Sequence, residues 1–164
     1  LFIKEMEKDS AIIFAKKAVN QALNANYFQK ALIANNLLSQ IYIDQNQLEI
    51  AEQFNETAIS LFSEVKDLKA MANAQILSLS IILHHNKLEQ GITLGNSILE
   101  NFGQSLDSEM KEKVYNQLFE AYIKLGEEDK VLKIKDSLLF YTHQSFDEEN
   151  TSLLAKMYDE TLYK

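Results

Sequence analysis

The sequence predicts an all-α protein, an α-solenoid of about four repeats in which antiparallel helix pairs form a right-handed superhelix. Composition supports this fold class, because the 164 residues include no Pro and only 4 Gly, and so few residues that break or end a helix. Hydrophobic residues make up 46% of the chain, enough for a folded core, and no apolar segment alternates as a β-strand would. The third observation, an internal repeat, determines how the helices follow one another.

The repeat has a period of 40 residues and needs no gaps. Within each unit the recurring positions lie 3, 4 and 7 residues apart, which is the spacing of one helix face. One set of equivalent positions comprises Ala11, Ala51, Gly91 and Val131; Phe14, Phe54, Leu94 and Ile134; Ala18, Ala58, Ile98 and Leu138; and Val19, Ile59, Leu99 and Leu139. A second set precedes it, with Ala34, Ala74, Val114 and Leu154; Ile41, Ile81 and Ala121; and Phe2, Tyr42, Ile82, Tyr122 and Leu162. We therefore expect each unit to contain two helices, A and then B, joined by a short turn.

In chain order, this register predicts nine helices, counting one fragment. The A helices are expected at residues 1–5 (the fragment), 28–44, 68–84, 107–124 and 147–163, and the B helices at 9–23, 47–64, 87–102 and 127–142. The whole chain, 1–164, is then one array, divided into a partial repeat 1–27, repeats 28–67, 68–106 and 107–146, and a final helix 147–164. Because residues 1–3 match residues 41–43, we expect a further repeat before them in a longer parent protein.

The turns between helices carry their own pattern. Residues 46–49 and 86–89 both read Asn-x-x-Glu, which predicts an Asn N-cap with a carboxylate three residues later. Gly126 stands in the third equivalent place, where a residue at positive φ would also serve. Ser145 and Glu148 mark the expected start of the last helix.

Composition and motifs exclude several classes of function. The 24 acidic residues outnumber the 16 basic ones, all Lys, so the net charge of -8 disfavours nucleic acid as a partner. No apolar stretch approaches the roughly 20 residues of a membrane span, so we expect no membrane insertion. The Gly-x-Ser-x-Gly, His-Glu-x-x-His, Walker and Gly-x-Gly-x-x-Gly motifs are absent, so we expect neither an enzyme nor a cofactor.

Metal sites are not expected either. The chain has no Cys, and the adjacent His84 and His85 diverge by about 100° around a helix, so they cannot bind one ion together. The acidic clusters 127–129 and 147–149 are expected to lie at helix starts, where the helix dipole favours negative charge. The glycines 91 and 95 fall inside a predicted helix and are expected to be packing contacts.

The helix pattern resembles that of the tetratricopeptide repeat family. A large residue late in helix A (Tyr42, Ile82, Tyr122) precedes small residues seven apart in helix B, and the stretch 51–59 is the clearest instance. The resemblance covers essentially the whole chain and implies a right-handed array that binds proteins or peptides. The chain departs from the family in its period of 40 rather than about 34, and in lacking Trp and the Pro that ends helix B. HEAT and armadillo repeats share the longer period but generally use the Pro and Arg that are missing here.

The C-terminal region resembles the last repeat of tetratricopeptide sensor regions in bacterial signalling proteins. Residues 133–139, then Gln144 and Ser145, and the run 149–163 carry this resemblance. It implies that an effector, a histidine kinase or a helix-turn-helix output domain, follows in the parent protein. It also implies a periplasmic location if the region is a sensor ectodomain, with the cytoplasm as the alternative.

A concave groove lined by the A helices is the predicted binding site. If residues 34, 38, 41 and 42 face the core, then residues 33, 36, 40 and 44 face the groove. The repeat groups Asn36, Ile76, Asn116 and Lys156; Gln40, Ser80, Glu120 and Glu160; Ile33, Asn73, Lys113 and Leu153; and Asp44, His84 and Lys124. Amides offer both a donor and an acceptor to a peptide backbone, so the polar residues of these groups are the candidate peptide-binding residues. They are Asn36, Gln40, Asp44, Asn73, Ser80, His84, Lys113, Asn116, Glu120 and Lys124.

The expected function is therefore that of a non-enzymatic module, the sensor or scaffold part of a signalling protein, that binds a protein or peptide. A co-chaperone is disfavoured because the dense basic set that grips a C-terminal carboxylate in chaperone-binding members is not present. The alternative is a structural spacer or oligomerisation array in which these positions are ordinary solvated residues. A homodimer is left open.

Overall fold

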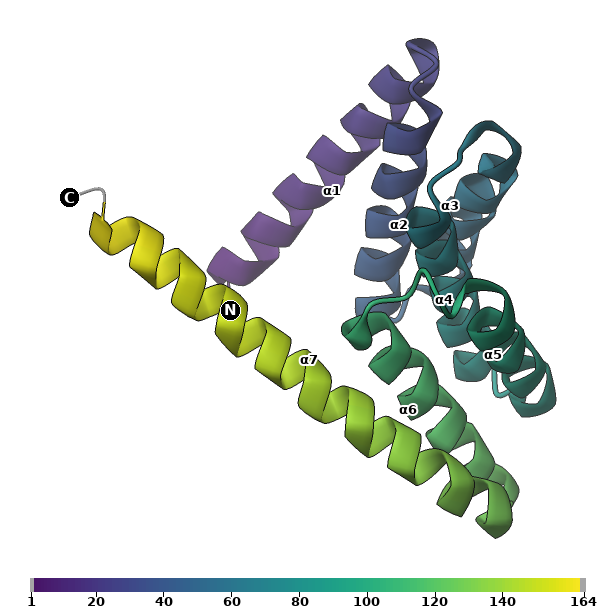
Figure 1. The fold of residues 1–164 in the computed structure, drawn as a ribbon. Helices are drawn as coiled ribbons and strands as arrows, with labels where there is room; N and C mark the ends of the chain where they lie inside the picture. Colours follow the sequence, from purple (N-terminus) through teal and green to yellow (C-terminus); the bar gives the residue numbers. More distant parts are fainter. Residues whose placement is uncertain (1, 163–164) are drawn as a thin grey trace.

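The computed structural model describes the backbone of residues 2–162 and the side chains of residue 10 and residues 12–146. In this part the chain forms seven α-helices and one short 3-10 helix, with no strand, which confirms the all-α class (Figure 1). The elements are α1 (Phe2–Asn24), α2 (Phe28–Asp44), α3 (Leu48–Ser60), the 3-10 helix η1 (Phe62–Glu64), α4 (Leu68–His84), α5 (Leu88–Phe102), α6 (Ser108–Leu125) and α7 (Glu128–Leu162).

Helix contacts remain between near neighbours in the sequence. Each α-helix packs against the next one along the chain, and in addition α2 contacts α4 and α4 contacts α6. Figure 1 shows the same order in space, from α1 through α4 to α7. This pattern, in which every second helix meets its equivalent in the next unit, is a repeat-like helical architecture.

The ends of the chain differ from the predicted helices. From Phe2 onward, the predicted fragment and the first predicted B helix lie in one continuous helix, α1, and between Glu128 and Leu162 the last two predicted helices likewise lie in the single long helix α7. Ser145 therefore starts no helix, and its hydroxyl lies within hydrogen-bond reach of the Glu112 carboxylate and the Thr142 carbonyl oxygen. The segment 143–146 contains no residue at positive φ of the kind that ends other helices of this chain, so α7 runs on through it.

The turns use asparagine differently from the prediction. Asn46 and Asn86 are not N-caps; they have φ values of 58°, and Gly126 at the third equivalent place has a φ of 72°. In each case the residue after the turn donates its N–H to a carbonyl five residues back, as Gln47 does to Tyr42 at 2.8 Å. This is the Schellman C-cap, in which Asn or Gly adopts the left-handed conformation. The same motif with Asn26 separates α1 from α2.

Two aspartates begin A helices in a way that the sequence reasoning missed. Asp67 accepts a hydrogen bond from the Ala70 N–H at 3.0 Å, and Asp107 accepts one from the Met110 N–H at 2.9 Å. Both are N-caps, and they stand 40 residues apart. The repeat therefore encodes helix starts in these aspartates, and helix ends in Asn and Gly.

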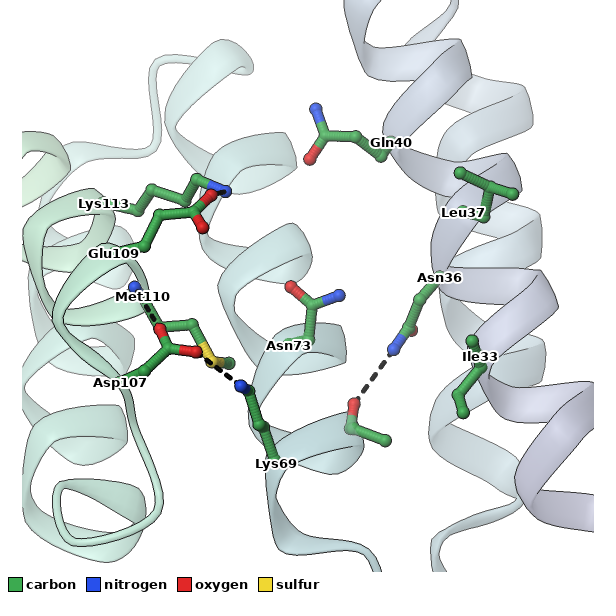
Figure 2. A pocket seen from close by; sticks show the side chains of 11 residues that line it. Ile33, Asn36, Leu37, Gln40, Lys69, Asn73, Asp107, Glu109, Met110 and Lys113 are labelled. Atoms are coloured by element: carbon green, nitrogen blue, oxygen red, sulfur yellow. Dashed lines mark hydrogen bonds and ion pairs between the residues drawn. The ribbon is translucent and has the colours of Figure 1, made fainter. Parts of the chain in front are cut away.

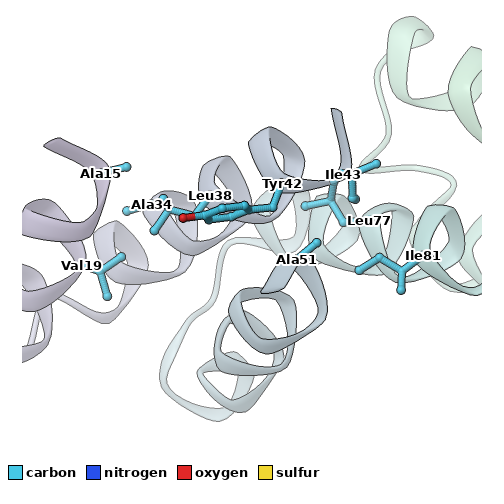
Figure 3. Packing of buried hydrophobic residues seen from close by; sticks show 9 residues of the cluster. All are labelled: Ala15, Val19, Ala34, Leu38, Tyr42, Ile43, Ala51, Leu77 and Ile81. Carbon is cyan, nitrogen blue, oxygen red and sulfur yellow. The ribbon is translucent and has the colours of Figure 1, made fainter. Parts of the chain in front are cut away.

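Close helix contacts in the middle of the array rest on small residues, as predicted. Ala51 and Ala58 of α3 are both 0% exposed, and Phe54 between them stacks on Tyr42 with ring centroids 5.5 Å apart. Figure 3 shows the buried cluster around Tyr42 and Ala51, which joins residues of α1, α2, α3 and α4. A Cβ at Gly91 or Gly95 of α5 would collide with Leu83 or Leu118, which confirms these two glycines as packing contacts.

The predicted core register holds only in part in α1. Phe14 and Ala18 occupy the positions of Phe54 and Ala58, yet both are exposed, and Phe14 is 70% exposed. Val19 is buried as predicted, but it shares the buried face with Ala15 and Ala22, because this helix packs mainly against α2. The predicted positions at Phe2, Ala11, Leu153, Leu154, Lys156, Glu160 and Leu162 lie outside the residues whose side chains are described.

Candidate functional site

Two hollows lie along the surface formed by the A helices α2, α4 and α6, and we call them together the groove. The first hollow has a volume of about 530 Å³ (Figure 2). It is lined by Ile33, Asn36, Leu37 and Gln40 of α2, by Lys69, Ala70 and Asn73 of α4, and by Asp107, Glu109, Met110 and Lys113 at the start of α6. The second hollow lies between α4 and α6 and is lined by Ser80, Leu83, His84, Asn86, Gln117, Glu120 and Lys124.

The repeat itself positions these side chains. Ile33, Asn73 and Lys113 are equivalent residues, one from each A helix, and all three line the first hollow. Because α2 packs on α4 and α4 on α6, residues 40 positions apart come to lie side by side across the groove. Asn73 lies in the middle of this row, and Figure 2 shows it between Asn36 and the α6 residues.

Charged pairs form the α6 side of the first hollow. Lys69 Nζ lies 2.5 Å from Asp107, and Lys113 Nζ lies 2.6 Å from Glu109, so the four charges cancel locally. Partial burial acts to raise the pKa of Asp107, but the bond from Lys69, the Met110 N–H and the nearby positive charges outweigh it, so this pKa lies below its usual value. The hydrogen bond to Asp107 in turn raises the pKa of Lys69.

Asn36 provides a buried acceptor in the first hollow. Its side chain is 4% exposed, and its Nδ2 donates to the Ala70 carbonyl oxygen at 2.9 Å. A carbonyl can only accept, so the amide orientation is determined and Oδ1 is the free end. That oxygen is buried and has no hydrogen-bond partner among the described residues.

Gln117 provides a second such acceptor, in the second hollow. Its Nε2 donates to Ser80 Oγ at 2.7 Å, and Ser80 Oγ donates in turn to the Ile76 carbonyl oxygen at 3.1 Å. The serine hydroxyl donates its only proton to the Ile76 carbonyl oxygen, so it accepts the hydrogen bond from Gln117 Nε2. Gln117 Oε1 is therefore the free end of the amide, and it is buried without a partner in the described part of the chain. His84 Nδ1 lies 2.8 Å from the Ser80 carbonyl oxygen, so this nitrogen carries the proton.

Most of the predicted groove residues meet in these two hollows. Four line the first hollow (Asn36, Gln40, Asn73, Lys113) and four line the second (Ser80, His84, Glu120, Lys124). Asp44 and Asn116 line neither; Asp44 instead accepts a hydrogen bond from Gln40 Nε2 at 2.8 Å, and Asn116 is exposed.

The burial of Asn36 was not predicted. Asn36 was expected to face the groove and it lines the first hollow, but its side chain is buried because α4 approaches α2 closely enough for its amide to bond the Ala70 carbonyl. Ile76, its equivalent in α4, is buried as well. Asn36 therefore helps to hold α2 on α4, and its oxygen is shielded from solvent at the edge of the groove.

The sequence reasoning also missed several residues of the site. Lys69, Asp107 and Met110 were not among the candidates, and neither was Gln117. A signal for Gln117 was present, because it stands where the repeat has Leu37 and Leu77. A polar residue at an apolar repeat position could have indicated a site.

The groove presents paired charges, an apolar wall and residues with amide acceptors, and groups of these kinds can contact a ligand. In the described part of the chain, no three His, Asp or Glu side chains are placed to hold a metal ion. Among the same residues, no helix combines the length and apolar character needed to cross a membrane. No family model and no curated protein sequence matches the chain.

Proposed function

We propose that the chain is a tetratricopeptide-like α-solenoid of antiparallel helix pairs, wound as a right-handed superhelix, whose groove binds an extended peptide or protein segment. In this proposal it is a non-enzymatic sensor or scaffold region of a bacterial signalling protein. The single observation that carries the binding role is that two of the three buried amide oxygens without a partner among the described residues, Asn36 Oδ1 and Gln117 Oε1, belong to residues that line the groove, one in each hollow; the third, Asn55 Oδ1, belongs to a residue that lines neither.

Unpartnered buried acceptors favour a ligand that donates hydrogen bonds. A buried polar atom without a partner costs about 1–3 kcal/mol, and a ligand donor that reached it once the covering side chains had shifted would recover that free energy. The N–H groups of an extended peptide recur along its length and can reach acceptors in successive hollows. Asn73 and His84 add further polar groups along the same path.

The first hollow also favours an apolar side chain in the ligand. Ile33 and Leu37 of α2 are about half exposed and form one wall, and the buried Met110 lies on the opposite side. Burying an aliphatic side chain there would contribute roughly 25 cal/mol per Å² of apolar surface removed from water. The locally balanced charges of the α6 side do not demand a charged ligand.

The test is binding of a library of short extended peptides to the 164-residue chain, followed by titration calorimetry of the best binders. Gln117→Leu removes the free acceptor while placing at this position the residue that α2 and α4 carry, so folding should persist. We expect it to weaken peptide binding by about fivefold to a hundredfold, in line with about 1–3 kcal/mol, without lowering the melting temperature.

Gln53→Leu is the matched control, because Gln53 is exposed on α3 and lines neither hollow. It should leave peptide affinity unchanged. Equal weakening by both variants would remove the groove from consideration, and a library that yields only non-specific binding would favour the alternative of a spacer or oligomerisation array. The observation that supports this alternative is the exposed apolar surface of the outer helices α1 and α7.

A further inference from the structure

An apolar stripe runs along the outer face of α7, and we call its three residues the α7 stripe. Leu132, Leu139 and Phe146 are spaced seven residues apart and are 65%, 49% and 63% exposed. Residues seven apart lie on one side of a helix. The stripe is therefore a row of three exposed apolar side chains on one side of α7, separated by the exposed polar pairs Lys135 and Asp136, and Thr142 and His143, and no described residue covers it.

The repeat indicates what kind of element fits this stripe. Forty residues earlier, the same positions are Ile92, Leu99 and Leu106. Leu106 belongs to the buried cluster that contains Met110, Val114 and Leu118 of α6. Ile92 and Leu99 pack against the same cluster. In that unit the three positions lie against a core that the following A helix, α6, helps to form, whereas in the unit before it the first and last of them are the exposed Glu52 and Lys66. The α7 stripe thus shares the apolar composition of the unit in which α5 receives the A helix α6.

The chain contains such a helix but holds it away from the stripe. Residues 147–162 continue the repeat, with Asp147 in the place of the N-caps Asp67 and Asp107, and Leu154 in the place of Val114. In the structure this segment is the second half of α7, a helix of 35 residues and therefore about 50 Å long. Two halves of one straight helix cannot pack on each other.

Contacts with α6 maintain the straight form up to residue 145. Tyr141 stacks on Tyr115 with centroids 5.4 Å apart, and Ser145 bonds the Glu112 carboxylate. Since α6 begins at Ser108, only about one more turn of it remains beyond Glu112. The second half of α7 therefore extends past the end of α6, as Figure 1 shows.

From this we infer that the partner of the α7 stripe is residues 147–162 of a second copy of this chain. In the resulting two-fold dimer, each long α7 lies antiparallel to the other, and each copy supplies the A helix that completes the other's last repeat. The axis would pass near residue 145, where the sequence carries a helix start that the straight α7 does not use. Such an exchange reproduces the existing α5–α6 packing with a helix from another chain, which is the character of a domain swap.

The first experiment measures the oligomeric state of the 164-residue chain by light scattering over a range of concentrations. We expect a dimer that Leu132→Glu with Leu139→Glu converts to a monomer, raising the dimer Kd at least about a hundredfold, because charges would be buried on the stripe. Ile13→Glu is the matched control; Ile13 is as exposed as Leu132 but lies at the other end of the array, so its variant should remain dimeric. A wild-type chain that stays monomeric, or a dimer insensitive to the stripe variants, would overturn the inference.

A second experiment separates the exchange from any other dimer. The chain has no cysteine, so Gln144→Cys, at an exposed position near the axis, accepts a single spin label per chain. Two antiparallel helices pack 8–10 Å apart, so we expect one short interspin distance, below about 25 Å. A dimer with only long distances would be a different dimer. Gln144→Pro should break α7, let residues 147–162 fold back on their own stripe and yield a folded monomer; a Gln144→Pro dimer would contradict the exchange.

These readouts are independent of the peptide-binding proposal. The α7 stripe shares no residue with the groove, so loss of dimerisation in the stripe variants and loss of peptide binding in Gln117→Leu can each occur without the other.

Discussion

The inner helix α3 and the outer helix α1 carry the same repeat residues but bury different ones. Phe54 and Ala58 of α3 lie against neighbours, with Phe54 stacked on Tyr42 and Ala58 fully buried, whereas Phe14 and Ala18 of α1 face solvent. The difference lies in the surroundings. In this array the burial of a repeat position is determined by whether a second helix is present, and the residue type alone does not decide it.

The contacts explain the contrast. α3 packs against α2 on one side and α4 on the other, while α1 packs mainly against α2. α7 repeats the situation at the opposite end, because it packs mainly against α6. Equivalent substitutions at inner and outer positions should therefore have unequal effects, which makes pairs of matched variants the natural way to test the comparison.

The largest difference is expected for the two phenylalanines. Phe54→Ala removes the ring stacked on Tyr42 and should lower the free energy of unfolding by about 2–4 kcal/mol, somewhat less than a fully buried Phe because Phe54 is partly exposed. Phe14→Ala should change it by no more than about 0.5 kcal/mol. Urea unfolding of both variants measures the difference. Equal losses would mean that α1 is covered in solution by an element that hides Phe14.

The next difference concerns overpacking at the small residues. Ala58→Leu places three extra carbons in a fully buried contact and should cost about 1–3 kcal/mol. Ala18→Leu adds the same atoms to an exposed helix position and should be close to neutral. Thermal unfolding of the two variants provides the comparison, and a neutral Ala58→Leu would contradict the close α3 contact.

The smallest difference is expected between two N-caps with different neighbours. Asp107 pairs with Lys69, whereas Asp67, one repeat earlier, accepts a bond from the neutral Gln29 amide at 2.9 Å. Asn is also a good N-cap, so Asp107→Asn keeps the cap and removes mainly the ion pair, which is partly exposed and worth less than about 1 kcal/mol. Asp67→Asn has no such pair to lose.

The pH dependence distinguishes these two variants. Because the pKa of Asp107 is lowered on folding, its ionised form stabilises the fold above the unfolded pKa, and that contribution disappears as the pH falls through the lower, folded pKa. Asp107→Asn should therefore reduce the loss of stability as the pH falls below 3.8, the usual pKa of Asp. Melting curves between about pH 6 and pH 2 follow it, with Asp67→Asn alongside; an unchanged acid slope in Asp107→Asn would show that the pair with Lys69 is not maintained in solution.

Much of the fold was predictable because the repeat is regular. The bounds of α2 and α4, the buried Ala51 and Ala58, and the packing glycines all follow from a register that every unit shares. The turns were harder, because Asn suits both an N-cap and a left-handed C-cap, and the sequence alone does not choose between them. The helix break predicted at Ser145 is absent for a related reason. The sequence there has residues that can start a helix but none that ends the preceding one.

The groove could be predicted as a face but not as a site. Helical register places positions 33, 40 and their equivalents on one side, and the two hollows confirm that they come together. Register does not give the distance between α2 and α4, which decides that Asn36 is buried and bonded to Ala70. It also does not reveal the partners of Gln117 and Ser80, which leave one amide oxygen free.

The neighbour-to-neighbour contacts have a consequence for how the molecule opens. α4 packs against α2, α3, α5 and α6, while the first and last helices each rest mainly on one other helix. In a quasi-one-dimensional array of this kind, stability is a sum over local interfaces, so unfolding begins at the ends and moves inward one helix at a time. The groove residues of α4 belong to the part that melts last, and the chain can fray at both ends while its central groove stays intact.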